Sequence, residues 1–135
     1  MIRECIYWDD VAQYITMLQE NIEAHPFCKL DSVFGVPRGG LIPAVALSNR
    51  LKLPLINHIG AHTLICEDII DSGQTIAQIP RPRWVASLLV REGLRLDYWP
   101  TWYARTCSPD VWFVFPWEDP RGPTKPDRRW RYETL

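Results

Sequence analysis

The sequence predicts an α/β fold with a mainly parallel central sheet that is flanked by helices and carries a small hood. Short apolar runs at 32–36, 63–66 and 84–90 are typical of buried strands, and helical patterns alternate with them. The length of 135 residues and the 47% hydrophobic content suit one compact domain with a real core. We expect this domain, including a hood of aromatic segments, over residues 1–118, and a Pro/Arg-rich tail over 119–135.

Two helices are predicted on either side of the first strand. The first follows Trp8, because apolar residues recur there at helical spacing on one face. Those positions are Val11, Ile15, Leu18 and Ile22. The second is an apolar helix that follows the strand at 32–36 and runs to about Leu51.

Residues 64–75 carry most of the chemistry. The apolar stretch from Thr63 to Cys66 is predicted to be a buried strand that reaches the edge of the sheet, where ligands gather. Glu67 and Asp68 follow where this strand is expected to end. Their acceptor oxygens can therefore point toward ribose hydroxyl groups, or toward a metal ion held by the ribose.

A small polar turn follows the acidic pair and is predicted to hold a phosphate group. Gly73 permits backbone angles that other residues resist, and successive N–H groups of such a turn line a concavity. The hydroxyl groups of Ser72 and Thr75 add donors. The alternative is an acidic strand-to-helix loop with an ordinary Asp or Ser cap, although capping alone needs only one of these residues.

The order of these residues resembles the phosphoribosyl pyrophosphate (PRPP) signature of the type I phosphoribosyltransferases: a hydrophobic strand, Glu-Asp, two apolar residues and Asp-Ser-Gly-x-Thr. The resemblance implies that Glu67 and Asp68 hold the ribose 2′ and 3′ hydroxyls, with Mg²⁺ as the cofactor bound near them. It implies that Asp71 is the catalytic residue beside the base. The residues expected to wrap the 5′-phosphate are Ser72, Gly73, Gln74 and Thr75.

A second segment, Pro37-Arg38-Gly39-Gly40, follows the first strand and opens the second helix. Glycines let the backbone approach an anion, and Arg38 supplies a forked cation. The segment resembles the pyrophosphate loop of purine phosphoribosyltransferases, which implies pyrophosphate binding by Arg38 and Gly39 and a strained or cis Pro37-Arg38 bond. The alternative is an ordinary turn, which Pro and Gly clusters usually mark.

A third segment, residues 111–118, is similar to the Trp-x-x-x-Pro-Trp stretch of xanthine-guanine and related 6-oxopurine phosphoribosyltransferases. The resemblance implies that Trp112 stacks on the purine ring and that Phe113 reads the purine edge through main-chain groups. An aromatic face suits a heterocycle. The alternative is a core strand with aromatic side chains.

The sequence departs from the family in three places. The connection between Pro54 and Leu64 is very short, whereas the family inserts a long flexible loop there. The lid over PRPP is therefore expected to be missing. Pro80 and Pro82 should stop the helix after the phosphate turn early, because proline removes a donor and clashes with the preceding turn. The lysine that meets the purine 6-oxo group is absent, and Arg91 is the only close cation at a comparable position.

These observations predict a pentosyltransferase of purine salvage that transfers 5-phosphoribose from PRPP to a 6-oxopurine and releases pyrophosphate. Its expected partners are PRPP, a purine base, the nucleoside 5′-monophosphate and a second copy of the chain in a homodimer or higher oligomer. One alternative is a PRPP- or nucleotide-binding regulatory module with weak or no catalysis. Another is a phosphoribosyltransferase for a different base, which the missing lysine permits.

Composition excludes several other classes. The net charge of −1 argues against a nucleic acid partner. No apolar run is long enough to span a bilayer and no leader opens the chain, so we expect a cytoplasmic protein without a membrane partner. His58 and His62 stand four residues apart, but their segment has strand and turn character, which disfavours a helical zinc pair.

Overall fold

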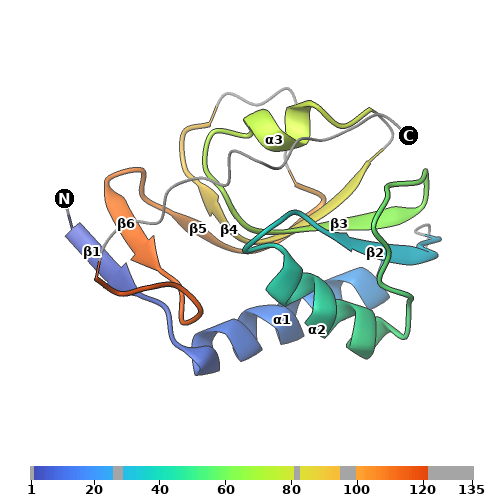
Figure 1. The fold of residues 1–135 in the computed structure, drawn as a ribbon, viewed down its shortest axis with the longest axis horizontal. Helices are drawn as coiled ribbons and strands as arrows, with labels where there is room; N and C mark the ends of the chain where they lie inside the picture. The colour runs from blue at the N-terminus through green and yellow to red at the C-terminus, as the bar shows by residue number, and fades with distance from the viewer. Residues whose placement is uncertain (1, 26–28, 81–82, 95–99, 122–135) are drawn as a thin grey trace.

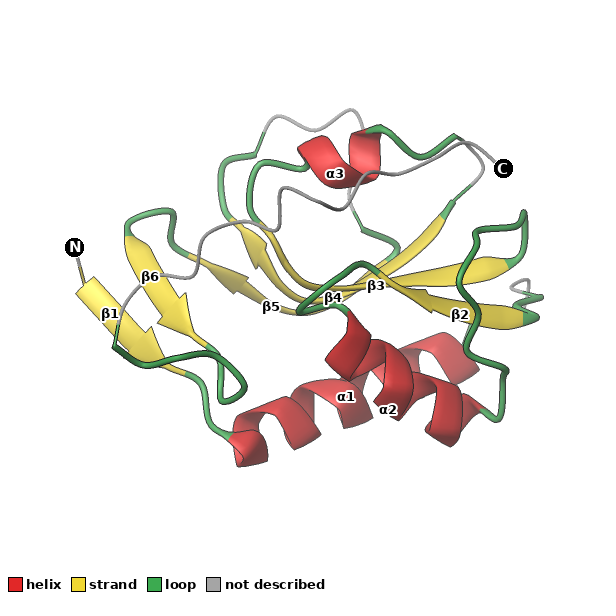
Figure 2. Ribbon diagram, viewed as in Figure 1, coloured by secondary structure: helices red, strands yellow, loops and turns green. Residues whose placement is uncertain are grey.

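The structure is a computed structural model that describes residues 2–25, 29–80, 83–94 and 100–121 (Figure 1). Its centre is a parallel four-stranded sheet in the order β2-β3-β4-β5, which confirms the predicted α/β fold. The strands are β2 (Ser32–Gly35), β3 (Thr63–Ile70), β4 (Trp84–Arg91) and β5 (Trp102–Cys107). Helices α1 and α2 cover one face of this sheet, and the short helix α3 lies over the other (Figure 2).

The two long helices begin and end where local chemistry favours it. Helix α1 (Trp8–Glu23) starts with a hydrogen bond of 2.9 Å from the Tyr7 N–H to the Asp10 carboxylate. Helix α2 (Leu41–Leu51) ends at Lys52, whose φ of 58° is in the left-handed region. The predicted apolar face of α1 is buried: Val11, Ile15, Leu18 and Ile22.

The predicted hood is a separate parallel pair of strands, β1 (Ile2–Cys5) and β6 (Val111–Val114). The Ile6 N–H extends the pairing with a 2.8 Å hydrogen bond to the Val114 carbonyl. The first and last described segments thus lie side by side at one end of the central sheet (Figure 1). This arrangement brings the aromatic strand β6 toward the ends of β4 and β5.

The predicted end of the strand that begins at Thr63 was wrong. We expected a strand from Thr63 to Cys66 with the acidic pair beyond it, but β3 continues to Ile70. Glu67 pairs with Ser87, and Ile69 pairs with Leu89. The apolar, β-branched residues after the acids favour an extended backbone and keep the strand in the sheet.

The helix after the polar turn and the connection before β3 are both short, as the sequence predicts. Helix α3 (Gln74–Ala77) is a single short helix that ends before Pro80. Between α2 and β3, Leu55 makes an isolated parallel bridge to Val33, and only residues 56–62 separate it from β3. The expected tail, 119–135, lies outside the described residues from position 122 onward, so its boundary stays a prediction. Among the described helices, none is both long and apolar enough to cross a membrane.

Candidate functional site

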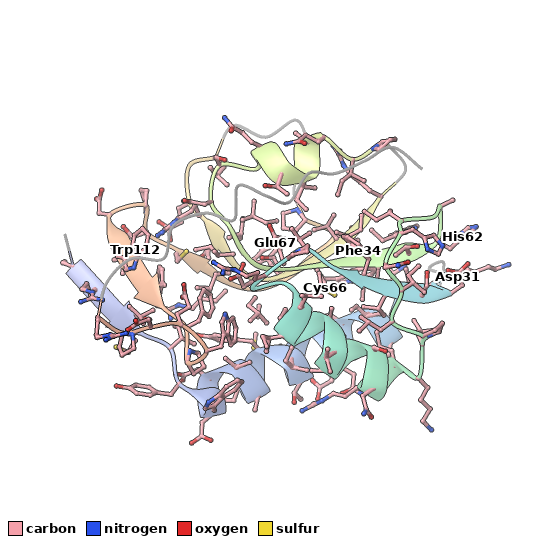
Figure 3. All side chains as sticks on the ribbon, viewed as in Figure 1. Asp31, Phe34, His62, Cys66, Glu67 and Trp112 are labelled. Carbon is pink, nitrogen blue, oxygen red and sulfur yellow. The ribbon has the colours of Figure 1, made fainter. Side chains whose placement is uncertain are left out.

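The predicted site residues gather at the C-terminal ends of the parallel strands. The segment after β2 carries Arg38 and Gly39, the end of β3 leads into the turn at 71–73, and Arg91 closes β4. Open parallel sheets bind ligands at this edge. Figure 3 shows Glu67 on the central sheet between Trp112 of the hood and His62 at the opposite end of the molecule. His62 therefore takes no part in the site.

The acidic pair Glu67 and Asp68, within the second half of β3, is partly buried and electrostatically unfavourable. Burial raises the pKa of Glu67 well above its usual value, and the neighbouring Asp68 carboxylate raises it further. Burial also raises the pKa of Asp68 to about 6, against the effect of a 2.8 Å hydrogen bond from the Ile69 N–H. Two carboxylates kept in such an environment are typical of a binding site rather than of a stable core.

The segment after β2 lies directly against this acidic pair. The Val36 N–H donates to the Cys66 carbonyl at 3.0 Å, which fixes the segment to β3. A Cβ atom on Gly39 would come within 1.9 Å of the Asp68 Oδ2 atom, and one on Gly40 within 2.4 Å of the Cys66 carbonyl oxygen. Only glycine allows this approach. The two predicted anion-binding segments are therefore adjacent in space.

The Pro37-Arg38 peptide bond is cis, as the resemblance to the pyrophosphate loop implies. Arg38 itself is exposed, and so its guanidinium is accessible to an anion. A cavity of about 620 Å³ lies beside this turn. Its lining is largely apolar and consists of Phe34, Gly35, Pro37, Leu41, Leu55, Ile56, Asn57 and His58. No acidic residue of the described ranges lines this cavity.

The turn after β3 has the backbone geometry that the sequence predicts. Gly73 stands at the N-terminus of α3 with a φ of 80°, which side chains other than glycine adopt only with strain. The Ser72 hydroxyl accepts a 3.3 Å hydrogen bond from the Gln74 N–H. Ser72 and Gln74 are exposed and Thr75 is partly exposed, so the donors of this turn are accessible to a phosphate.

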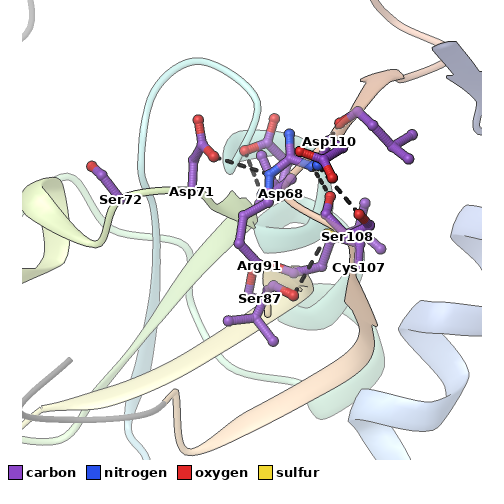
Figure 4. Close-up of polar contacts among 12 residues, drawn as sticks. Asp68, Asp71, Ser72, Ser87, Arg91, Cys107, Ser108 and Asp110 are labelled. Carbon is purple, nitrogen blue, oxygen red and sulfur yellow. Dashed lines mark hydrogen bonds and ion pairs between the residues drawn. The ribbon is translucent and has the colours of Figure 1, made fainter. Parts of the chain in front are cut away.

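Arg91 connects the turn to the hood (Figure 4). It is only 7% exposed, and its Nε donates to the Asp71 carboxylate at 3.0 Å. Its Nη1 donates to the carbonyl groups of Ser108 and Val111, each at 2.6 Å. The guanidinium also lies 5.2 Å from the ring centroid of Phe113, within cation–π distance. The structure thus brings together Asp71, Arg91 and the strand that carries the expected base contacts.

The two hood residues expected to meet the base differ in burial. Phe113 is 5% exposed and packs in the core, whereas Trp112 is partly exposed. Successive side chains of a strand point to opposite faces, so Trp112 presents its ring on the face of β6 away from Phe113. An accessible indole suits stacking on a heterocycle, whereas Phe113 combines a core side chain with the predicted main-chain contact.

Sequence reasoning missed Glu118 and Arg105. The Glu118 carboxylate lies close enough to Asp68 to raise its pKa, and its Oε1 accepts a 2.8 Å hydrogen bond from the Phe115 N–H. Arg105 lies in β5 and pairs with Glu4 of the hood. An acid directly after Pro116-Trp117 was the available signal for Glu118. Arg105 gives no local signal, because Glu4 is 101 positions away.

The acidic pair fits a magnesium ion that is held together with substrate. Among the described residues, no group of three or more His, Cys, Asp or Glu side chains is arranged as a metal site. Mg²⁺ commonly takes one or two carboxylates and completes its shell with water and substrate phosphates. Glu67 and Asp68 match that mode, since each supplies carboxylate oxygens and the two side chains lie next to each other in a partly buried place.

Comparisons with known proteins agree with this geometry. No family model matches the sequence. The xanthine-guanine phosphoribosyltransferase of Chromohalobacter salexigens is 25% identical over 140 residues, covering 84% of this chain and 82% of that protein. A purine phosphoribosyltransferase from Pyrococcus horikoshii has a similar structure, with a TM-score of 0.74, 26% identity and coverage of 93% of this chain and 100% of that one.

A further structure, the xanthine-guanine-hypoxanthine phosphoribosyltransferase of Helicobacter pylori, shares the fold with a TM-score of 0.66 at 17% identity. It covers 82% of this chain and 91% of that one. The sequence match, the similar structures and the site geometry confirm the expected resemblance. By sequence and structure the chain is thus most similar, among these proteins, to type I phosphoribosyltransferases that act on purines.

Proposed function

We propose that this chain transfers 5-phosphoribose from PRPP to N9 of a 6-oxopurine base, namely guanine, xanthine or hypoxanthine, and releases pyrophosphate. One observation carries the proposal: Arg91 lies 3.0 Å from Asp71 of the PRPP motif and 5.2 Å from the Phe113 ring in the hood. A phosphate turn alone would suit many nucleotides. Its connection to an aromatic strand favours a site that holds a base beside a ribose phosphate.

The proposed reaction depends mainly on the control of charge. As the bond between ribose C1 and pyrophosphate breaks, positive charge grows on the ribose ring, and the carboxylates of Glu67 and Asp68 favour that cation. Arg38 stabilises the leaving pyrophosphate. The new bond forms between C1 and the purine nitrogen, and Asp71 accepts the proton that the purine loses.

The proposed cofactor is Mg²⁺, which Glu67 and Asp68 would hold together with the ribose hydroxyls. When bound, the ion neutralises charge on the pyrophosphate group. The carboxylates must be ionised for this role; Asp68, whose pKa burial raises to about 6, meets this condition above that pH, whereas burial and the Asp68 carboxylate raise the pKa of Glu67 well above its usual value and oppose its ionisation.

Arg91 governs the expected base selectivity. Arginine commonly pairs with the O6 and N7 atoms of guanine, so it can replace a lysine that meets the 6-oxo group. Here the guanidinium is already held by Asp71 and by the carbonyl groups of Ser108 and Val111. Because it cannot adjust freely to each base, we expect weak discrimination among guanine, xanthine and hypoxanthine.

Pyrophosphate release from PRPP and Mg²⁺ with a panel of bases tests the proposal. The expected result is release with all three 6-oxopurines, at rates that differ by less than about tenfold, or 1.4 kcal/mol. Uracil and orotate serve as comparison substrates. Faster release with either pyrimidine than with every purine tested would contradict the purine assignment.

A PRPP- or nucleotide-binding regulatory module is the second candidate. The short connection 56–62 favours it, since a lid in this position normally excludes water during the reaction. Under this alternative, calorimetry detects binding of PRPP and guanosine 5′-monophosphate, but no base in the panel supports turnover. Binding with turnover excludes it.

A further inference from the structure

Phe113 lies at the centre of a cluster that joins the hood to the central sheet. Two arginines reach its ring: the Cζ atom of Arg91 is 5.2 Å and that of Arg105 is 5.5 Å from the ring centroid. Both distances are within the cation–π range of about 6 Å. We call the three residues the Arg–Phe–Arg cluster. Phe113 is 5% exposed and Arg91 is 7% exposed, so this side of the cluster is buried.

The two arginines leave the central sheet on the same face. Leu89 pairs with Arg105 and Arg91 pairs with Cys107 in the parallel register of β4 and β5. Paired residues, and residues two apart in one strand, share a face of the sheet. The strands therefore present both guanidinium groups to the ring that enters from β6.

Each arginine is fixed to a different part of the site. Arg91 is held by Asp71 and by the carbonyl group of Val111 in β6. Arg105 makes a bidentate pair with Glu4 of β1, at 2.6 Å from Nη1 to Oε2 and 3.1 Å from Nη2 to Oε1. Its Nη1 also donates to the Tyr14 hydroxyl at 3.3 Å. Bidentate pairs fix orientation as well as distance.

The pairing of the hood strands makes the Arg105 contact bear directly on the base site. Glu4 is the register partner of Phe113. The bidentate pair therefore fixes the hood beside Phe113, the residue whose main chain is expected to contact the base. The Arg105 and Glu4 side chains are 38% and 41% exposed, and an exposed pair of this kind contributes little to global stability. Its strict geometry fits a role in orientation better than one in stability.

We propose that Arg105 is a positioning residue for the purine base: through Glu4 and the Phe113 ring it sets the place of Trp112 and Phe113 relative to Asp71. This inference rests on the proposed function. Loss of Arg105 should leave the phosphate turn at 72–75 unchanged, because no described contact of Arg105 reaches it. The base should then bind more weakly while the ribose phosphate binds as before.

Calorimetry on the full chain with guanosine 5′-monophosphate and with ribose 5-phosphate separates the base from the sugar phosphate. Arg105→Met should weaken the nucleotide at least fivefold and change ribose 5-phosphate by less than twofold. Glu4→Gln should shift the nucleotide in the same direction, and Arg105→Lys should recover part of the loss. Arg50→Met is the matched control, since Arg50 also joins two elements, with bonds to Thr16 and Gln19, but away from the hood.

In steady-state assays the same variants should raise the KM for the base and leave the KM for PRPP within twofold. Equal weakening of both ligands, or unchanged nucleotide affinity in Arg105→Lys and Glu4→Gln, would overturn the inference even if Arg105→Met does not fold. If the unmodified chain binds neither ligand, the proposed function fails first. A chain that binds both ligands but whose Arg105 variants behave like Arg50→Met overturns the positioning role alone.

Discussion

At the proposed phosphate site, one backbone conformation, that of Gly73, makes a direct test possible. Its φ of 80° is strained for a side chain with a Cβ branch, so Gly73→Val should abolish binding of ribose 5-phosphate and PRPP by changing the turn. Gly93→Val is the matched control, because Gly93 has a φ of 74° and open space around it in a turn outside the phosphate site. Calorimetry measures both variants. Unchanged affinity in a folded Gly73→Val protein would refute the phosphate assignment.

Asp68 links the site to stability through its pKa. The folded-state pKa of about 6 exceeds the usual 3.8, so the favourable contribution of its protonation is complete below pH 3.8 and is lost as the pH rises through about 6. Asp68→Asn, which does not titrate, should therefore be more stable than the unmodified chain by roughly 1 to 3 kcal/mol at pH 7.5. Near pH 4 this difference should become small.

Urea unfolding at pH 4, 5, 6 and 7.5 measures this dependence. Asp119→Asn is the control, since Asp119 is a carboxylate whose pKa is lowered by the adjacent Arg121. It should give no stabilisation at pH 7.5. A stability difference for Asp68→Asn that stays constant across this pH range would show that burial does not raise the pKa of Asp68.

The elements differ in how far the sequence predicts them. The apolar face of α1, the end of α2 near Leu51 and the short α3 follow from local spacing, composition and proline, so they were predictable. The end of β3 was not predictable from the sequence. Acidic residues locally indicate the end of a strand, but pairing with β4 keeps these residues in the sheet. The pairs Arg91–Asp71 and Arg105–Glu4 were beyond prediction, since tertiary packing brings together residues 20 and 101 positions apart.

The short segment 56–62 makes a specific prediction for catalysis. Without a long lid, water can reach the cationic sugar, so we expect slow transfer together with detectable hydrolysis of PRPP to ribose 5-phosphate. Adding the base at saturation should lower, but not remove, the hydrolysis. Separation of ribose 5-phosphate from nucleotide by ion-exchange chromatography measures both products, and strict transfer without hydrolysis would contradict the open-site account.

At the scale of the whole molecule, the Arg-rich tail is the candidate for a substitute lid. Removing residues after Arg121 keeps the 3.0 Å bond from Arg3 to the Pro120 carbonyl and deletes the basic residues beyond it. If the tail covers the site, transfer should fall and hydrolysis should rise in the truncated, folded protein. Unaltered rates of both reactions would remove the tail from the mechanism.

The expected homodimer stays a prediction, which sedimentation of the full and truncated chains would also test.

The central claim is that the acidic edge of the sheet and the aromatic hood together transfer phosphoribose to a purine. The most direct test is the chemical identity of the product formed from PRPP, guanine and Mg²⁺, followed by chromatography of nucleoside monophosphate alongside pyrophosphate. We predict guanosine 5′-monophosphate that accumulates with time and is absent with Gly73→Val. Pyrophosphate without any nucleotide, or PRPP that binds and is never consumed with any purine, would contradict the account.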